Sequence, residues 1–476
     1  MALATTLGLT LYVLTRDNRP DKSIPMPFFD WPILGNLVTI AINSISGVEL
    51  YDMVERTAKL GNYWMHIPAL GGMELHISDP PSIKALLEDL DSFALPPYRF
   101  FLFGELFGHG IFLSNGEAWN FQRNLAKPIF NLPSRTDMFE TYHKAAKNLL
   151  KVLEEAAASG ETLELQQLFK RFTLDTFSQI GFGYPISSLL HPVQFSSSFD
   201  WIFREVDNRM KFPWRKITKE REWRYHVGVI EDFIVGLIAE RRKEGWEGKK
   251  DFLSRLLEME AQKEITGVTE KFLKDQVMNF MIAGRDTTAI LLAATFYFLA
   301  QDERVEGKVV REIEEVVGKE EVTMNHTKEL RYLKNVLDES LRLHPPAVPI
   351  NSRICVKDVV LPNKVVVRKG GLVGYSPFVV HRLKEFWGED ADEFKPERWE
   401  DKDILKHPYQ FVPFQKGPRQ CLGMNMAYEE AKCCIAILYQ SGFRFKLLNK
   451  ENPLLHNMAA ILTARNGINV KVQKIN

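Results

Sequence analysis

Apolar residues recur every three or four positions over much of the 476-residue chain, as they do along the buried face of a helix. This spacing predicts helices over 142–156, 162–180, 221–243, 251–262, 269–300, 303–317, 328–343 and 424–440. The segment 269–300 would be about 48 Å long and must cross a large domain. Charged residues such as Asp275 and Arg285 lie within it, so we do not expect it to span a membrane.

Short stretches with the composition of strands are few and scattered between these helices. They predict strands over 62–67, 72–78, 364–370, 459–464 and 468–473. Many helices with few short strands indicate a mainly α fold with a small β region. No Gly/Ser-rich linker or repeat interrupts the chain, so we expect residues 21–476 to form one large domain.

The N-terminal segment has a different character from the rest of the chain. Residues 1–15 are mostly apolar and carry no charge, but as a helix they would span roughly 22 Å, less than the ~30 Å hydrocarbon core of a membrane. We expect a short or truncated membrane anchor over residues 1–20; a flexible or surface-docked terminus is the alternative. The cations that follow, Arg16, Arg19 and Lys22, would hold the following chain on the cytoplasmic side of the membrane.

Charge and cysteine content exclude several classes of protein. The 61 basic residues balance 61 acidic ones, so a nucleic acid is not the expected partner. The four cysteines, Cys355, Cys421, Cys433 and Cys434, are too few for a disulfide framework and indicate a reducing compartment. No pattern indicates an oligomer, and we expect a monomer.

Cys421 stands in an unusual local context. Phe414, Gly417 and Arg419 precede it, and Gly423 leads into the predicted helix that follows. Backbone N–H groups at a helix N-terminus favour a thiolate, and the glycines allow a flat partner to approach closely. On these grounds Cys421 could be a metal ligand, a nucleophile or a buried structural cysteine.

The spacing Phe414-x-x-Gly417-x-Arg419-x-Cys421-x-Gly423 matches the haem-binding signature of the cytochrome P-450 superfamily. Further motifs of that family follow in its order: Trp119-x-x-x-Arg123, Ala283–Thr288, Glu339-x-x-Arg342 and Phe394–Trp399. From about residue 25 to its end, the chain resembles this superfamily. The resemblance implies the cytochrome P-450 fold, with a long central I helix, and a haem-thiolate monooxygenase.

The same resemblance assigns cofactor-binding roles. Cys421 would be the axial ligand of the haem iron, its thiolate donating electron density that favours O–O cleavage. Phe414 would pack against the macrocycle, while Gly417 and Gly423 give it room. The haem propionates would meet Trp119, Arg123, Arg353 and Arg419. Relatives with covalently bound haem carry Glu where this chain has Met281, so the resemblance implies non-covalent haem b.

Within 269–300, the resemblance identifies Asp286 and Thr287 as the acid–alcohol pair that delivers protons during dioxygen activation. Thr287 can bond a carbonyl one turn back and open the helix. Ala283 and Gly284 would leave room for a diatomic ligand over the iron. The pair argues for a true monooxygenase rather than a non-oxidative isomerase or dehydratase, and against a haem sensor or carrier.

Glu339, Arg342 and Arg398 are expected to form a buried charged triad with a structural role. Removing one partner would leave a buried charge unpaired, so Arg342→Ala should abolish haem incorporation.

No dinucleotide-binding motif or flavin-like domain follows Gly423. Electrons should therefore come from NADPH through a separate NADPH–cytochrome reductase, with a cytochrome b5-type protein as a second donor. Lys127, Lys416 and Lys432 could meet an acidic partner of this kind.

The motif AGRDTT and its flanking segments resemble fungal and plant branches that oxidise fatty acids and alkanes, so we expect hydroxylation of a long chain. An oxygenase of a terpenoid, sterol or polyketide pathway is the alternative. Arg99, Arg209 or Lys211 could meet a carboxylate, although residues 206–217 could equally lie on the membrane surface. The expected substrate pocket is lined by Phe100, Phe103, Phe107, Met210, Phe212, Ala283, Val348, Ile350 and Ala460.

Overall fold

The computed structural model describes residues 20–26, 36, 42–43, 48–67, 72–130, 132–212, 214–262, 269–347, 351–450, 454–458 and 461–475. All but the last residue of the expected anchor lies outside these ranges, as do Val348, Ile350 and Ala460. Within them, no helix combines the length and apolar character that crossing a membrane requires.

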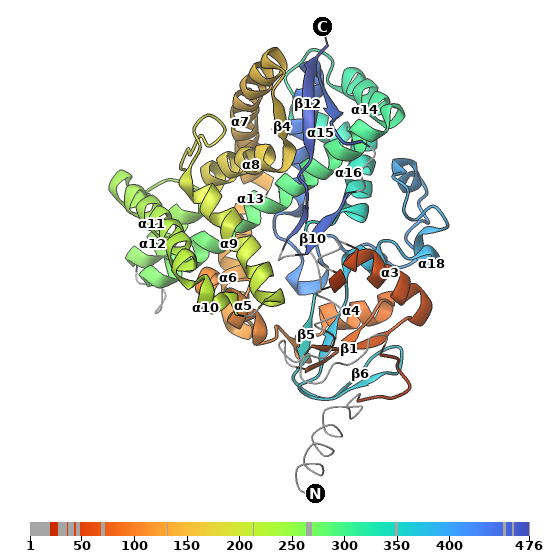
Figure 1. Ribbon diagram of the computed structural model, residues 1–476. Coiled ribbons are helices and arrows are strands. Elements are labelled where there is room, and N and C mark those ends of the chain that lie inside the picture. The colour runs from red at the N-terminus through yellow and green to blue at the C-terminus, as the bar shows by residue number, and fades with distance from the viewer. Residues whose placement is uncertain are drawn as a thin grey trace, which may run out of the picture.

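Helices make up most of the molecule and surround one long central helix (Figure 1). The helices are α3 (Glu49–Leu60), α4 (Pro80–Glu88), α5 (Tyr98–Phe107), α6 (Gly116–Ala126), α7 (Leu132–Ser159), α8 (Leu165–Phe182), α9 (Gln194–Lys211), α10 (Arg215–Thr218), α11 (Glu220–Glu244), α12 (Phe252–Gln262), α13 (Glu270–Gln301), α14 (Glu303–Val316), α15 (Met324–Glu329), α16 (Arg331–Leu343), α17 (Pro377–Val380), α18 (Lys384–Trp387) and α19 (Met424–Gln440). Short 3-10 turns are η2 (Lys127–Phe130), η3 (Pro396–Glu400), η4 (Pro408–Gln410) and η5 (Gly417–Arg419).

The central helix is α13, and α8 packs along it. It begins where the Thr269 hydroxyl accepts the Phe272 N–H at 3.2 Å, an N-cap that satisfies one of the free amides of the first turn. Gly284 lies at its middle, where a Cβ would be 2.0 Å from the Phe177 ring of α8. The two helices can approach this closely only because residue 284 has no side chain.

The largest sheet has the strand order β1-β2-β8-β5-β3. It lies beside α3 and α4, below the helical part in the view of Figure 1. A three-stranded sheet, β4-β12-β9, closes the opposite end. The strands are β1 (Tyr63–Ile67), β2 (Gly72–His76), β3 (Phe93–Ala94), β4 (Thr162–Glu164), β5 (Arg353–Cys355), β6 (Val359–Val360), β7 (Val366–Val367), β8 (Leu372–Gly374), β9 (Phe443–Leu447), β10 (His456–Met458), β11 (Leu462–Ala464) and β12 (Asn469–Lys474).

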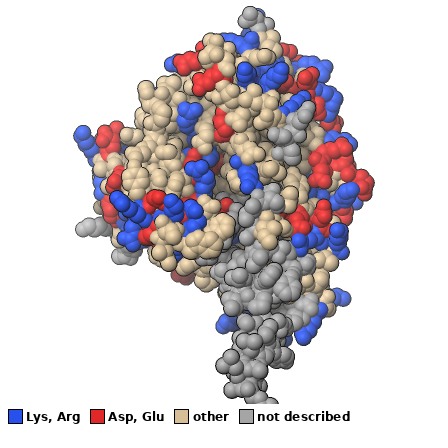
Figure 2. Space-filling model, viewed as in Figure 1, with Lys and Arg blue, Asp and Glu red and all other residues tan. Residues whose placement is uncertain are grey.

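The expectation of a mainly α fold with a small β region is confirmed. Several predicted helix boundaries were wrong: α7 begins at Leu132 and not at 142, and 328–343 is divided between α15 and α16. Residues 162–164 form strand β4 and α8 begins only at Leu165, because β4 pairs with β12 at the far end of the chain. Helix α9 was missed among its serines, although Phe195, Phe199 and Ile202 keep helical spacing and are buried. On the face seen in Figure 2, basic and acidic side chains are interspersed, as the zero net charge suggests.

The core contains a carboxyl group, that of Glu430, which forms no ion pair with the described residues. Glu430 of α19 is buried and accepts a hydrogen bond from the Thr176 hydroxyl of α8. Burial raises the pKa of Glu430 to about 8, although the Thr176 hydrogen bond opposes this shift. Glu430 is therefore protonated in the folded protein at neutral pH.

Glu430→Gln should remove a pH dependence of stability. Between the unfolded pKa, about 4.5, and the folded pKa of about 8, the folded state binds more protons, so stability falls as pH rises through this window. From pH 6 to pH 8.5 the wild type should lose on the order of 2 kcal/mol more than Glu430→Gln in denaturant unfolding of the purified protein. Identical pH dependence in the two proteins would contradict the assignment.

Candidate active site

The loop that carries Cys421 is built by a tight turn and backbone hydrogen bonds. The Cys421 N–H donates to the Phe414 carbonyl at 2.9 Å, and the Gln420 N–H donates to the Gly417 carbonyl at 3.0 Å. Gly417 has φ +72°, and a Cβ there would lie 2.8 Å from the Leu87 carbonyl oxygen of α4. Only glycine satisfies both the conformation and the close approach, so Gly417 fixes the loop against α4.

Cys421 has solvent-exposed surface, and yet protein atoms surround its sulfur on most sides. Both observations hold if its sulfur faces an internal cleft. Burial raises the pKa of the Cys421 thiol, while a hydrogen bond from the Gly423 N–H and the charge of Arg123 oppose this shift. The helix-end effect expected from the sequence is therefore outweighed by burial, and a stable thiolate needs a further positive partner such as a metal cation.

Arginines surround the same loop. Arg123 of α6 donates to the Gln420 carbonyl at 2.7 Å, and its guanidinium carbon lies 5.7 Å from the centre of the Trp119 ring. The guanidinium carbon of Arg419 lies 4.4 Å from the same ring. Burial, with Arg99 and Arg123 nearby, lowers the pKa of Arg419 to about 10.

Arg353 of β5 completes this cationic cluster. It is buried, and burial with Arg99 and Arg419 nearby lowers its pKa to about 9. Its Nε has no hydrogen-bond partner among the described residues, and its Nη2 reaches Gln415 only at 3.5 Å. Buried cations with unused donors indicate a site for an anion.

These observations fit an iron porphyrin with carboxylate side chains. The soft sulfur of Cys421 suits the metal, and the arginines suit the carboxylates. The structure thus brings together Trp119, Arg123, Arg353, Arg419 and Cys421, which lie on α6, on β5 and on the Cys421 loop.

The polar residues in the middle of α13 form a buried ionic chain. Arg285 contacts Asp286 at 2.6 Å and Asp200 of α9 at 3.0 Å, and Lys170 of α8 contacts Asp200 at 3.0 Å. Burial raises the pKa of Asp286 although Arg285 opposes the shift. Burial would also raise the pKa of Asp200, but Arg285 and Lys170 together lower it to about 2. The Thr287 hydroxyl donates to the Ala283 carbonyl at 3.0 Å.

Two roles expected on α13 and α19 need correction. The space beside Gly284 is filled by Phe177, because α8 packs there, so this glycine serves helix packing and not room over a metal. Lys432 is buried and donates to the Thr327 carbonyl at 2.7 Å, so it is not available to an acidic partner.

The expected substrate residues divide into two groups. The Phe107 ring is buried and lies 5.6 Å from Phe103 and 6.4 Å from Phe203 of α9. Phe100 is exposed beside His109, and Phe212 lies against the exposed Trp214. Met210 and Lys211 belong to α9, but the described part of the structure does not include their side chains.

Arg209 cannot serve a carboxylate ligand as the sequence suggested. Its guanidinium lies 3.5 Å from both Glu205 and Glu220 and 4.0 Å from the centre of the Trp223 ring. These contacts use its charge, because two carboxylates already face it.

The expected triad forms as a fully buried cluster. Glu339 and Arg342 have no exposed side-chain surface and meet at 2.8 Å, and Arg398 Nε donates to Glu339 at 2.8 Å. Lys395 N–H and Trp399 Nε1–H also donate to Glu339, so both carboxylate oxygens are satisfied.

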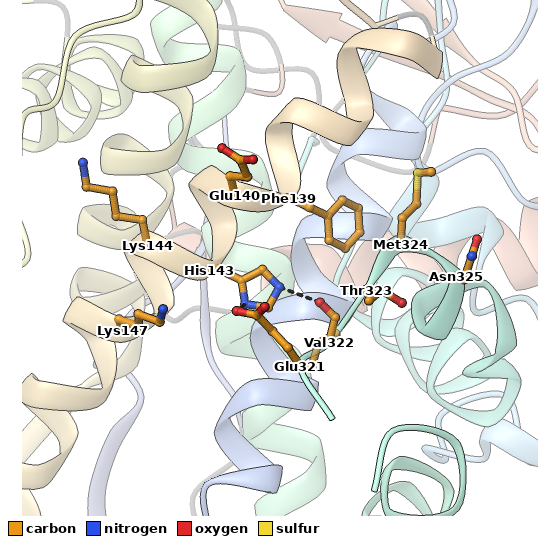
Figure 3. Close-up of a pocket in the computed structure, with 10 residues that line it drawn as sticks. All are labelled: Phe139, Glu140, His143, Lys144, Lys147, Glu321, Val322, Thr323, Met324 and Asn325. Atoms are coloured by element: carbon orange, nitrogen blue, oxygen red, sulfur yellow. Dashed lines mark hydrogen bonds and ion pairs between the residues drawn. The ribbon is translucent and has the colours of Figure 1, made fainter. Parts of the chain in front are cut away.

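A pocket of about 590 Å³ lies away from these groups, between α7 and residues 321–325 (Figure 3). His143 Nε2 lies 2.5 Å from the Val322 carbonyl oxygen, and Glu321 and Lys147 lie on the same rim. None of the predicted site residues lines this pocket, so it has no part in the chemistry discussed below.

A family model for cytochrome P450 matches residues 25–472. The chain belongs to the cytochrome P450 family. Cytochrome P450 704C1 of Pinus taeda is 29% identical over 518 residues, with 99% of this chain and 96% of that protein covered. Cytochrome P450 704B1 of Arabidopsis thaliana is 32% identical over 424 residues, covering 78% and 80%. Cytochrome P450 monooxygenase fsdH of Fusarium heterosporum is 28% identical over 443 residues, covering 87% and 76%.

A P450 uses haem b and dioxygen, with electrons from a reductase, so this chain is a haem-dependent monooxygenase and an oxidoreductase. The motifs of the family did not reveal Asp200, which pairs with Arg285, nor Asp275 and Asn279, which hydrogen-bond to the backbone of residues 107–112. Asp275 and Asn279 carried a signal, because a polar side chain in the interior of a long helix normally needs a partner.

Arg342→Ala should prevent recovery of haem-loaded protein. The substitution leaves Glu339 buried with fewer donors and removes hydrogen bonds to the His381, Ala391 and Glu393 carbonyls, costing roughly 3–5 kcal/mol. The measurement is Soret absorbance per protein after expression. Arg368→Ala, which breaks an exposed pair with Asp358, is the matched control and should retain full absorbance. Full Soret absorbance in Arg342→Ala would contradict the role of the triad.

Proposed function

We propose that this P450 hydroxylates a long-chain fatty acid or alkane-like substrate, with Cys421 as the axial ligand. The cationic cluster of Arg123, Arg353 and Arg419 around the Cys421 loop is the observation that supports haem at this place. When bound, haem supplies the activation of dioxygen and its transfer to carbon. The rest of the reaction depends on how the chain orients groups and moves protons.

Two residues of α13 are proposed to manage protons. A hydrogen bond to the Ala283 carbonyl orients the Thr287 hydroxyl, which can pass a proton toward the cleft. Asp286 can replenish that proton, because burial raises the pKa of its carboxyl. Arg285 orients Asp286, and Asp200, which also pairs with Lys170, balances the charge of Arg285. The site therefore holds an acid next to an alcohol inside the protein.

The aromatic rings between α5 and α9 support an elongated apolar substrate. Phe103, Phe107 and Phe203 follow one another at ring distances of 5.6 and 6.4 Å, and Phe199 lies 4.8 Å beyond Phe203. Phe107, Phe199 and Phe203 are buried, so these rings make the region between α5 and α9 apolar. The motifs resemble those of fungal and plant fatty-acid and alkane hydroxylases, and the relatives above come from plants and a fungus.

We propose that the enzyme lies at the cytosolic face of the endoplasmic reticulum membrane and receives electrons from an NADPH–cytochrome reductase. Trp214 and Ile217 are 62% and 83% exposed, beside the exposed Phe101, whose ring lies 4.4 Å from Lys216 Nζ. An apolar group next to a cation is typical of a membrane-surface contact. This observation favours the alternative that residues 206–217 lie at the membrane and do not line the pocket.

Fatty acids of C12 to C18 should shift the haem spectrum of the purified protein from low to high spin. A chain that binds along the apolar rings would displace water from the site. Each additional buried CH₂ should make the binding free energy more favourable by about 0.8 kcal/mol, so the dissociation constant should fall as the chain lengthens. Alkanes of equal length are the matched control for the carboxylate. No shift with any acid or alkane would redirect the assignment to a terpenoid, sterol or polyketide oxygenase.

Thr287→Ala should lower product formed per NADPH consumed by about 10²-fold, because a positioned proton donor contributes about 10²–10⁴-fold. The amount of hydrogen peroxide formed per NADPH consumed should rise, because electrons that do not yield product reduce dioxygen to peroxide. Thr295→Ala is the matched control, since Thr295 also donates to a carbonyl one turn back, that of Leu291 at 2.8 Å, farther along α13. Unchanged coupling in Thr287→Ala, or an equal loss in Thr295→Ala, would contradict the proton role.

A further inference from the structure

Tyr428 of α19 forms a hydrogen-bonded pair with a carboxylate that the proposed reaction does not use. Its hydroxyl donates to Asp338 Oδ1 of α16 at 2.7 Å. Lys334, one turn before Asp338, lies with its Nζ 2.6 Å from Asp338 Oδ2 and 4.2 Å from the centre of the Tyr428 ring. Since Asp338 forms an ion pair with Lys334, it is a carboxylate and can accept a proton from a group within hydrogen-bond reach.

The Tyr428 ring is also connected to the Cys421 loop. Its centre lies 5.3 Å from that of the Phe414 ring, within the range of packed aromatic pairs. The Phe414 carbonyl accepts the Cys421 N–H at 2.9 Å. Tyr428 is in the second turn of α19, so it lies only about 7.5 Å from Gly423, the N-cap of that helix, along the helix axis. A path of covalent bonds, a hydrogen bond and a ring contact thus leads from Cys421 to Tyr428.

The surroundings of Tyr428 restrict its chemistry. Burial and the Asp338 carboxylate raise the pKa of Tyr428 well above its ordinary value, so the hydroxyl keeps its proton at neutral pH. Loss of an electron alone would leave a cationic phenol inside the protein, which is costly. Loss of an electron together with the proton leaves a neutral radical, and Asp338 is in place to accept that proton. The pair is therefore suited to a one-electron oxidation that is coupled to proton transfer.

The same group of side chains leads outward to solvent. The Lys334 side chain is 38% exposed, that of Asp338 is 11% exposed, and Tyr428 itself is only partly buried. An electron donor in solution can therefore approach Tyr428 from the outside, while Phe414 and the Cys421 loop lie on its other side.

We propose that Tyr428 is a redox-active residue that gives one electron to oxidised haem when no substrate consumes the oxidant, with Asp338 as the proton acceptor. This inference rests on the proposed function for Cys421 as the haem ligand. In the step, the O–H bond of Tyr428 breaks, the proton passes to Asp338, and the electron removes one oxidising equivalent from the haem. One electron from the reductase then converts the tyrosyl radical back to tyrosine, and Asp338 returns the proton.

The test uses haem-loaded protein without substrate, mixed with meta-chloroperoxybenzoic acid, a peroxyacid that oxidises haem directly. Freeze-quenched samples are measured by electron paramagnetic resonance, and ring-deuterated tyrosine identifies the radical as a tyrosyl radical. The wild type should give this signal. Because the chain has 13 tyrosines, labelling alone does not identify the one that is oxidised. Tyr428→Phe, which keeps a ring against Phe414, should lose most of the signal.

Tyr439→Phe is the matched control. Tyr439 belongs to the same helix, is buried and donates to a carboxylate, that of Glu306 at 2.9 Å, but it lies about three turns farther from the Cys421 loop. This variant should keep the full signal. A signal that survives in Tyr428→Phe, or that falls equally in Tyr439→Phe, would overturn the proposal.

Substitutions of Asp338 test the proton acceptor separately. Asp338→Asn keeps an oxygen that can accept the Tyr428 hydroxyl but cannot take up its proton, whereas Asp338→Glu keeps the carboxylate. The signal should be lost in Asp338→Asn and retained in Asp338→Glu. In the wild type the radical should form more slowly in heavy water, because the O–H bond breaks in the same step. Equal signals in the two variants would refute the role of Asp338.

A second measurement follows the haem itself. With repeated additions of the peroxyacid, Soret absorbance should be lost faster in Tyr428→Phe than in the wild type or Tyr439→Phe, because the oxidising equivalents remain at the haem. The carbon-monoxide spectrum, recorded before the peroxyacid is added, separates the two proposals. A spectrum without thiolate ligation would refute Cys421 as the ligand. A thiolate-ligated wild type that forms no tyrosyl radical would overturn the role of Tyr428 and leave the proposed function intact.

Discussion

The Cys421 loop depends on one buried carboxylate. Glu339 has no exposed surface and accepts hydrogen bonds from Arg342, Arg398, Lys395 N–H and Trp399 Nε1–H. Arg342 in turn donates to the carbonyls of His381, Ala391 and Glu393. A single ionic cluster therefore holds most of the chain between 381 and 399 against α16. Since burying these charges is costly, the cluster is stable only when every donor and acceptor is used.

The effect of this cluster reaches the thiolate through one histidine. The His381 carbonyl accepts a hydrogen bond from Arg342, and the Nε2 atom of His381 accepts the Val412 N–H at 3.0 Å. Burial together with the nearby arginines lowers the pKa of His381 to about 3, so the ring stays neutral and keeps an acceptor for that N–H. Val412 begins the stretch that leads to Phe414, whose carbonyl accepts the Cys421 N–H. The position of the sulfur thus follows from Glu339 by a short series of hydrogen bonds.

Sequence spacing predicted those parts of the site that are encoded locally. Glu339 and Arg342 share a helix face, and the Phe414–Gly423 motif is one continuous turn, so their contacts follow from short-range geometry. Partners that depend on tertiary packing were out of reach: nothing near Asp200 in sequence indicates Arg285, and Lys432 resembles any surface lysine until α15 covers it. Gly284 was predicted to leave room over the iron, but the Phe177 ring of α8 occupies the space beside it. The sequence shows that a side chain is missing at residue 284, but it does not show which part of the chain packs there.

Electrostatics links cofactor binding to stability. Arg353 and Arg419 are cations whose pKa values burial and neighbouring arginines lower to about 9 and 10, and no carboxylate pairs with either among the described contacts. Such a cluster costs free energy until an anion meets it, and the carboxylates of haem are the anions that the family supplies. Binding of haem must therefore offset the cost of these buried, unpaired cations. The free energy of haem binding then contributes directly to the stability of the folded protein. The balanced net charge of the chain hides this local excess, which only the three-dimensional arrangement reveals.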